Sequence, residues 1–319
     1  MLKLKYLFEN FELARQALAL YEYDEESLEE MMSFFRISSN AIYPFRQKGN
    51  REDICFLRLS PVEEKLPSHV ESDVGLILWL KEKGFPAMKP VPMKSGDFSK
   101  VIHTKWGDYN VSCFAKVPGN SLEDTKLNPH IVEGYGRILG RFHELMKTYP
   151  YGEKHGSHRD LLQEIGSRLE AYGAPEHILQ AYQVVCAQVG RLSISLENYG
   201  VIHYDFEPDN VFYDDTTDAF SVIDFDDAIT CWYALDIIRA LDVLDEGAAE
   251  FFLKGYESET KLTAEQRTTF FIMRKIVALQ EYATILHVLS EPVDNPPEWM
   301  AHIIRVLKQK LIFLGEKLQ

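Results

Sequence analysis

Three side chains in one short part of the chain carry the oxygen atoms that phosphoryl chemistry needs. The sequence His203-Tyr-Asp205-Phe-Glu-Pro-Asp-Asn210 is followed, after a polar turn, by Val222-Ile-Asp224-Phe-Asp-Asp. A carboxamide and a carboxylate side by side are hard oxygen ligands suited to Mg²⁺, which takes its remaining ligands from water and substrate phosphates. Asn210 and Asp224 are therefore candidate metal ligands. Asp205 is then free to orient and deprotonate a hydroxyl group that attacks a terminal phosphoryl group.

Short strands are predicted on both sides of this loop. Strand patterns occur at Gly200–His203, Asn210–Tyr213 and Phe220–Asp224, and a polar turn separates the last two. The resulting hairpin should bring Asp224 back beside Asn210. Most of the chain around these strands is predicted to be helical, at 128–146, 158–172, 175–198, 234–255, 263–290 and 296–317.

Two hairpins are predicted earlier in the chain. The strand patterns at 41–45 and 54–59 are separated by a segment that contains Gly49, a favourable turn residue. The patterns at 101–103 and 109–117 are separated by a second turn. These hairpins indicate a small antiparallel sheet.

Two helices accompany this sheet in the prediction. Apolar residues recur at helical spacing within 28–35 and again within 70–84. The Pro-Gly-Asn sequence that begins at Pro118 breaks the pattern. We therefore expect one lobe to comprise residues 1–117 and a second, mostly helical lobe to comprise residues 118–319.

The catalytic pattern resembles the aminoglycoside phosphotransferase and choline kinase family, the small-molecule branch of the protein-kinase-like fold. The pattern is His-x-Asp-x-x-x-x-Asn followed by Asp-Phe-x, and its family form is close to His-Gly-Asp-x-His-x-x-Asn and Ile-Asp-Phe-[Asp/Glu]. Further family-like segments are Val111–Gly119, Leu139–His143 and Trp232–Asp236. The resemblance extends over most of the chain. It implies an α+β, bilobal protein-kinase-like fold with a small N-terminal antiparallel-sheet lobe and a larger, mostly helical C-terminal lobe.

The same resemblance implies an activity. It indicates an ATP-dependent phosphotransferase that moves the γ-phosphoryl group to a hydroxyl of a small molecule, with Mg²⁺ as the metal. Asp205 would be the catalytic residue, and Asn210 and Asp224 would bind the metal. His203 would support the loop structurally. Asp236, in an apolar run, should be buried and should accept hydrogen bonds from backbone N–H groups of the catalytic loop.

The first lobe matches the family more loosely. Arg58 stands on the strand where the family carries a Lys or Arg that reaches the ATP phosphates. Arginine is always charged and can bind phosphate through two nitrogens, so this role is retained. Its partner on the following helix is a Glu in the family. Here the best-aligned residue is Asp73, with Glu71 as the alternative.

The remaining nucleotide contacts are expected from backbone and small polar groups. The phosphate-covering loop falls at Ser39 and Asn40 and contains no glycine pair. The adenine would lie against the backbone of the strand that links the lobes, at Ala115 and Val117.

The catalytic loop departs from the family at two positions. Tyr204 replaces the usual Gly, and Glu207 stands where a His is common. Neither change removes an acid, a base or a metal ligand. Glu207 and Asp226 are candidates for contacts to the acceptor or to a second metal ion.

The charge balance excludes some partners and favours others. The 319 residues contain 49 Asp or Glu and 34 Lys or Arg, a formal net charge of −15. Nucleic acid and anionic membranes are poor partners for such a chain. A cationic, amine-bearing acceptor is favoured over an acidic one. The amino-terminal segment lacks a secretory pattern, so we expect a cytoplasmic protein in which the four cysteines are free thiols.

Two questions stay open at this level. The acceptor could be an amino alcohol, a homoserine-like amino acid, an aminoglycoside or a sugar. The irregular first lobe also leaves room for a catalytically quiet, kinase-like binding or scaffold protein. A glycine pattern from Gly134 to Gly140 resembles a dinucleotide fingerprint, but it lies within a predicted helix and follows no strand.

Overall fold

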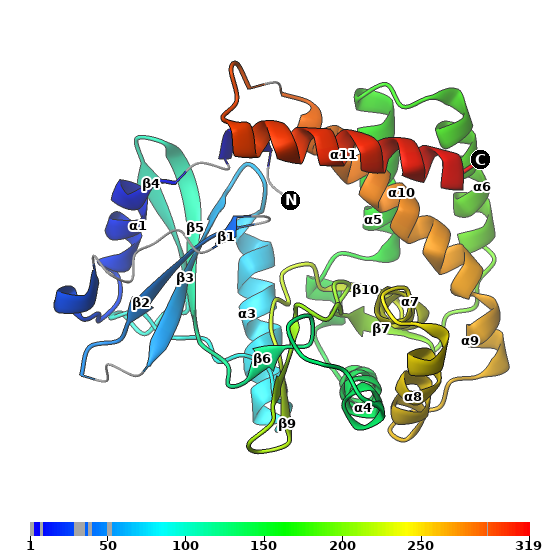
Figure 1. The fold of residues 1–319 in the computed structure, drawn as a ribbon, viewed down its shortest axis with the longest axis horizontal. Helices are drawn as coiled ribbons and strands as arrows, with labels where there is room; N and C mark the ends of the chain where they lie inside the picture. The colour runs from blue at the N-terminus through cyan, green and yellow to red at the C-terminus, as the bar shows by residue number, and fades with distance from the viewer. Residues whose placement is uncertain (1–2, 7–8, 29–35, 38–39, 50–52, 292) are drawn as a thin grey trace.

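The amino-terminal lobe is built on a five-stranded antiparallel sheet (Figure 1). Its strands, in the spatial order β1-β2-β3-β5-β4, are β1 (Arg36–Ile37), β2 (Ala41–Arg46), β3 (Ile54–Pro61), β5 (Gly107–Ala115) and β4 (Ser99–Thr104). Both predicted hairpins, β2–β3 and β4–β5, are present. The computed structural model describes residues 3–6, 9–28, 36–37, 40–49, 53–291 and 293–319. Most of the helix predicted at 28–35 lies outside the described residues.

Two helices of this half of the chain belong to different hydrophobic cores. Helix α1 (Phe11–Leu18) packs with the sheet in a small core of its own. Helix α3 (Pro67–Glu82) instead buries Val74, Ile77 and Leu80 in the larger core of the helical lobe. Figure 1 shows α3 between the sheet and the helices. A side chain on α3 can therefore face the space between the two lobes.

The carboxy-terminal lobe is mostly helical. Its helices are α4 (Pro129–Met146), α5 (His158–Ala171), α6 (Glu176–Val189), α7 (Ala234–Leu241), α8 (Glu246–Glu257), α9 (Ala264–Thr268), α10 (Phe270–Leu289) and α11 (Glu298–Lys317). Its short strands are β6 (Asn120–Ser121), β7 (Tyr199–Ile202), β8 (Val211–Asp214), β9 (Ala219–Val222) and β10 (Ile229–Trp232). They form two small sheets, β10-β7 and β6-β8-β9. The result is the bilobal α+β architecture that the sequence predicts.

Two of the predicted helices are interrupted. The helix expected at 234–255 is divided into α7 and α8, because the Asp245 side chain accepts a hydrogen bond from the backbone N–H of Ala248 (2.8 Å) and caps a new helix. The helix expected at 263–290 is likewise divided into α9 and α10. Strands β6 and β10 were not predicted, since each gains its partner only through the tertiary fold.

No helix in the described part of the chain is long and apolar enough to cross a membrane. The four cysteines Cys55, Cys113, Cys186 and Cys231 are free thiols, as predicted.

Two of the glycines that resemble a dinucleotide fingerprint, Gly136 and Gly140, let helices α4 and α8 approach each other closely. A Cβ atom added to Gly136 would lie 1.9 Å from the carbonyl oxygen of Phe252. A Cβ atom on Gly255 would lie 1.8 Å from the carbonyl oxygen of Glu133 on the opposite helix. Both distances are far inside van der Waals contact, so these positions require glycine for packing.

Replacing Gly136 with Ala is therefore expected to destabilise the fold. The added methyl group must push α8 away, which should lower the free energy of unfolding by about 1–3 kcal/mol. Gly75 in α3 is a matched control, because an added Cβ there meets nothing within 4 Å. Gly75→Ala should be neutral or stabilising by about 0.5–1 kcal/mol. Urea denaturation of both variants checks the difference, and equal effects would contradict this account of the helix contact.

Candidate active site

The loop of residues 203–210 joins β7 to β8 and presents the predicted catalytic groups. Strand β8 pairs with β9 so that Val211 lies opposite Val222. The backbone N–H of Ile223 then donates to the carbonyl oxygen of Asn210 (3.0 Å). This register places Asp224 directly beside Asn210, as the hairpin pattern predicts.

The start of this loop has an unusual backbone conformation. Tyr204 has a φ of 71°, in the left-handed region that favours glycine. This explains why the family usually has Gly at the position. The backbone N–H groups of His203 and Tyr204 donate to the two carboxylate oxygens of Asp236, at 2.8 and 2.7 Å. These hydrogen bonds hold the strained segment in place.

Asp236 itself is completely buried on α7 and has several donors. The Nε2 atom of His143 lies 3.1 Å from Asp236 Oδ2, and His143 Nδ1 lies 2.9 Å from the hydroxyl of Tyr256. Burial lowers the pKa of His143, although Asp236 acts in the opposite direction, so the imidazole is a neutral structural group. His203 is fixed similarly, with Nε2 2.9 Å from the carbonyl oxygen of Ile223. Asp236 and the two histidines therefore form a rigid support beneath the loop.

Asp205 and Asn210 are joined directly by hydrogen bonds. The Asn210 amide nitrogen Nδ2 donates to both the carbonyl oxygen and Oδ2 of Asp205, each at 2.9 Å. Burial raises the pKa of Asp205 to about 7; the Arg239 guanidinium opposes this shift, and the Asp227 and Glu207 carboxylates add to it. A carboxylate with a pKa near neutral pH is well suited to accept a proton.

Arg239 is a site residue that the sequence reasoning missed. This buried side chain on α7 contacts Glu207 Oε1 (3.0 Å) and lies 3.7 Å from Asp205 Oδ1. Its guanidinium also lies 4.9 Å from the ring centroid of Tyr204. The sequence did contain a signal for Arg239. An Arg three residues after Asp236, in an apolar helix, is expected to be buried and therefore to pair with a carboxylate.

Asn210 and Asp224 can supply two ligands for a divalent metal. Because Nδ2 of Asn210 is used toward Asp205, its carbonyl oxygen Oδ1 is the atom left for a metal. Asp224 accepts from Arg58 through Oδ1 (3.0 Å), which leaves Oδ2. Burial and the neighbouring Asp226 and Asp227 carboxylates raise the pKa of Asp224 despite the nearby Arg58. A bound cation would relieve this repulsion, so the residues fit a metal that is shared with nucleotide phosphates.

Arg58 has different partners from those expected. Its guanidinium, on β3, forms ion pairs with Asp224 and Asp226. The predicted partner, Asp73, binds Lys65 Nζ instead (2.7 Å), and the alternative, Glu71, is exposed to solvent. The prediction of an Arg58–Asp73 pair is therefore wrong in this structure.

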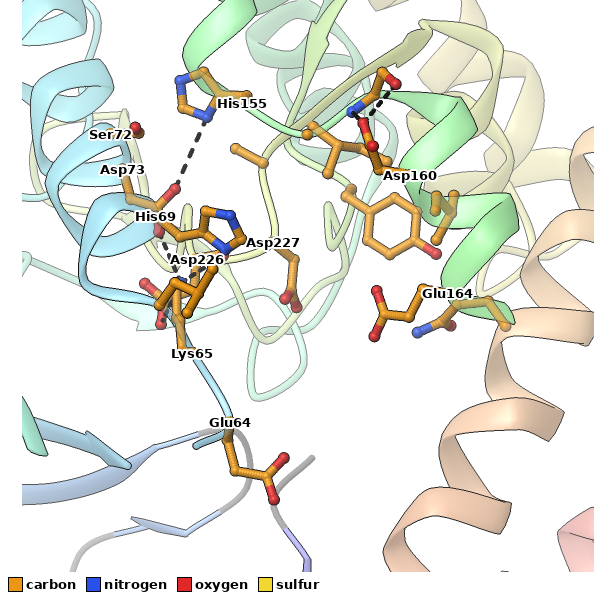
Figure 2. A pocket seen from close by; sticks show the side chains of 18 of the residues that line it. Glu64, Lys65, His69, Ser72, Asp73, His155, Asp160, Glu164, Asp226 and Asp227 are labelled. Carbon is orange, nitrogen blue, oxygen red and sulfur yellow. Dashed lines mark hydrogen bonds and ion pairs between the residues drawn. The ribbon is translucent and has the colours of Figure 1, made fainter. Parts of the chain in front are cut away.

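The reason is the position of Lys65 in the loop between β3 and α3. Its ammonium group lies between α3 and the segment after Asp224, and it also donates to the carbonyl oxygen of Asp226 (2.6 Å). Burial alone would lower the pKa of Lys65, but the Asp226 and Asp73 carboxylates raise it above its ordinary value. Figure 2 shows Lys65, Asp73 and Asp226 together at one wall of a cavity. Lys65 therefore occupies the position beside Asp73 where Arg58 was expected.

Asp226 is the centre of this charged cluster. It accepts from Arg58 and from the Asn40 amide Nδ2 (2.7 Å), and its carboxylate lies 3.5 Å from Lys65 Nζ. Although burial acts in the opposite direction, Arg58 and Lys65 hold the pKa of Asp226 at about 2. Its carboxylate is engaged within the protein, which argues against the predicted contact to an acceptor or a second metal. Glu207, the other such candidate, is engaged with Arg239.

The predicted nucleotide contacts in the first lobe are partly described. Asn40 is buried and directs its amide nitrogen to Asp226, while Ser39 lies outside the described residues. Ala115, at the end of β5, donates its backbone N–H to the carbonyl oxygen of Lys89 (2.9 Å). Ala115 and Val117 both line a cavity of about 500 Å³.

Comparisons with known proteins agree with this geometry. The sequence matches the phosphotransferase enzyme family (APH) over residues 43–271, which is more than half of the chain. It is 25% identical over 277 residues to the amicoumacin kinase of Bacillus subtilis (strain 168), covering 81% of this chain and 80% of that protein.

Solved structures show the fold. An amicoumacin kinase in complex with AMP-PNP, Ca²⁺ and Ami has a TM-score of 0.77 at 20% identity, covering 96% of this chain and 94% of that chain. A microcompartment-associated aminopropanol kinase has a TM-score of 0.72 at 19% identity, covering 97% and 95%. The bilobal architecture is thus the protein-kinase-like phosphotransferase fold. The chain belongs to the phosphotransferase enzyme family and is an ATP-dependent kinase that phosphorylates a hydroxyl group of a small molecule.

Proposed function

We propose that this kinase transfers the γ-phosphoryl group of ATP to a hydroxyl of a small cationic alcohol, with Mg²⁺ as its metal ion. The observation that carries the site assignment is the hydrogen-bonded group of Asp205 and Asn210, with Asp224 beside it, on the support formed by Asp236. The acidic surroundings of this group favour a positively charged acceptor. A bound divalent ion would reduce the repulsion between the nucleotide phosphates and these carboxylates.

The residues then have distinct roles. Asn210 and Asp224 would hold the metal, and Arg58 would contact the phosphates. Asp205 orients the acceptor hydroxyl in line with the γ-phosphorus and receives its proton as the new P–O bond forms and the bond to ADP breaks. ADP and the phosphorylated alcohol are the products.

The nucleotide would lie between lobes of residues 1–117 and 118–319. Its adenine would contact the backbone at Ala115 and Val117, and its phosphates would lie under Ser39 and Asn40. The cavity that Ala115 and Val117 line supports this placement, because it offers room for a ligand at the end of β5.

The proposal predicts that nucleotide binding depends strongly on Mg²⁺. Addition of ATP with Mg²⁺ should raise the midpoint of thermal unfolding, whereas ATP with EDTA should raise it much less, because uncompensated carboxylates repel the phosphates. A screen of alcohols coupled to ADP release then identifies the acceptor. Equal ATP affinity in EDTA would contradict the metal assignment. Tight Mg²⁺-dependent binding without turnover of any hydroxyl compound would contradict the proposed phosphotransfer itself.

A further inference from the structure

A cavity of about 400 Å³ lies between the lobes, next to the catalytic loop. Its walls come from α3, α5, α10 and the residues that follow Asp226, and Tyr204 of the catalytic loop also lines it. Figure 2 shows Asp227 between the side chains of α3 and the Asp160 and Glu164 side chains of α5. The volume suits a small organic molecule.

The cavity is close to the candidate catalytic group. Tyr204, in its wall, immediately precedes Asp205 in the chain. Gln280, in another wall, accepts from Arg239 (3.4 Å), and another nitrogen of the same guanidinium lies 3.7 Å from Asp205 Oδ1. A molecule in this cavity would therefore lie within one layer of side chains of Asp205.

The lining is strongly acidic. Seven of the lining residues are Asp or Glu, and three are Lys or Arg. The two lining histidines do not reduce this imbalance near neutral pH, because burial lowers the pKa of His155 to about 4 and also lowers the pKa of His69. The cavity thus favours a positively charged occupant.

Asp227 differs from the other acidic residues of this cavity. In the described part of the chain, each of the other six has a polar partner, such as Lys65 for Asp73, Arg168 for Glu164 and His287 for Glu64. The structure shows neither a hydrogen bond nor an ion pair from the Asp227 side chain to any described residue, and this side chain is exposed to the cavity.

A second polar group in the wall also lacks a partner. Tyr204 is only 5% exposed, and its hydroxyl makes no hydrogen bond of normal geometry with the described residues. A buried hydroxyl without a partner costs free energy, so a ligand that supplies one is favoured.

Two of the three cations of the cavity are paired with carboxylates. Lys65 binds Asp73 (2.7 Å) and Arg168 binds Glu164 (2.5 Å), whereas Lys154 is exposed and its Nζ lies 4.7 Å from the ring centroid of Tyr151. A carboxylate on the bound molecule would add negative charge to a space that stays acidic even when Lys154 is counted. Such an acceptor is selected against.

We propose that this cavity binds the acceptor, that Asp227 holds the acceptor's ammonium group, and that the acceptor is an amino alcohol without a free carboxylate. This inference rests on the proposed phosphotransferase activity and goes further by assigning a specificity-determining residue. It also separates two acceptor classes that the sequence leaves open, the amino alcohols and the homoserine-like amino acids.

The test uses three matched acceptors with the 319-residue chain and Mg²⁺-ATP. 3-Aminopropan-1-ol, homoserine and 1,3-propanediol share the same hydroxypropyl unit; homoserine adds a carboxylate, and the diol replaces the ammonium group with a neutral hydroxyl. The kcat/KM for the amino alcohol, from ADP release confirmed by detection of the phosphorylated product, should exceed both other values by at least about tenfold.

The variant Asp227→Asn should remove the preference for charge. The ratio of kcat/KM between the amino alcohol and the diol should fall by at least about tenfold, mainly through a higher KM for the amino alcohol. A general structural disturbance would instead lower both values together. Asp215→Asn is the matched control, because Asp215 is exposed in the turn between β8 and β9 and is not in the cavity wall. In Asp215→Asn, the ratio of kcat/KM between the amino alcohol and the diol should stay at the wild-type value.

The outcomes separate this inference from the proposed function. A preference for homoserine would overturn the exclusion of a carboxylate, and an unchanged ratio in Asp227→Asn would overturn the assignment of Asp227. Both outcomes would leave phosphotransfer intact. Turnover of larger alcohols without preference for an amine would overturn it as well. Absence of product with every alcohol, while Mg²⁺-ATP still stabilises the protein, would refute the proposed function itself.

Discussion

Replacing Asp205 with Asn is expected to lower turnover by about 10²–10⁴-fold, with little change in affinity for Mg²⁺-ATP. An amide oxygen at this position can still accept the hydrogen bond from Asn210, so the loop geometry should be preserved. The amide cannot receive the proton of the acceptor hydroxyl. Steady-state kinetics for the acceptor, together with the nucleotide-induced shift of the unfolding midpoint, measure the two effects separately.

The pH dependence gives a second check on Asp205. Burial raises its pKa to about 7, so the carboxylate form of this proposed catalytic residue is depleted below that pH. In the wild-type enzyme, kcat/KM for the acceptor should therefore rise with pH up to about 7 and then level off. The residual activity of Asp205→Asn should not show this rise with pH. Loss of ATP binding in the variant, or an unchanged pH profile, would contradict the assignment.

Replacing Arg58 with Met is expected to weaken both the fold and nucleotide binding. The buried guanidinium lies between Asp224 and Asp226, and its removal leaves two carboxylates facing each other. Breaking such a pair on one side costs about 3–5 kcal/mol; the lower end is expected here, because Lys65 still faces Asp226. Loss of the proposed contact between Arg58 and the nucleotide phosphates should weaken Mg²⁺-ATP binding by about 10–100-fold.

Arg58→Lys is the matched control for this prediction. It keeps the positive charge but loses the planar group that contacts two carboxylates at once. The Lys variant should therefore retain most of the stability while its affinity for ATP stays below that of the wild-type enzyme. Urea denaturation and isothermal titration calorimetry measure the two quantities. Wild-type ATP affinity in Arg58→Met would show that Arg58 serves only the internal cluster.

The sequence by itself was sufficient for the fold class and for the local grouping of the candidate residues Asp205, Asn210 and Asp224. The spacing of Asp205, Asn210 and Asp224 is local, because a short hairpin brings the last two together. Asp236 could also be assigned, since a carboxylate in an apolar helical run must find donors, and the nearest loop supplies them. Such features depend on neighbours in the chain or on the burial of one helix face, and both are visible in the residue pattern.

The partners of the charged residues were decided only by the tertiary structure. Arg58 was expected to bind Asp73, but the loop after β3 places Lys65 there and leaves Arg58 to Asp224 and Asp226. These groups come from distant parts of the chain, and the choice among several carboxylates depends on how α3 lies between the lobes. The acidic cavity around Asp227 has the same origin, because its walls come from both lobes. Long-range ion pairs follow from where the elements pack, and no local spacing in a single sequence encodes that position.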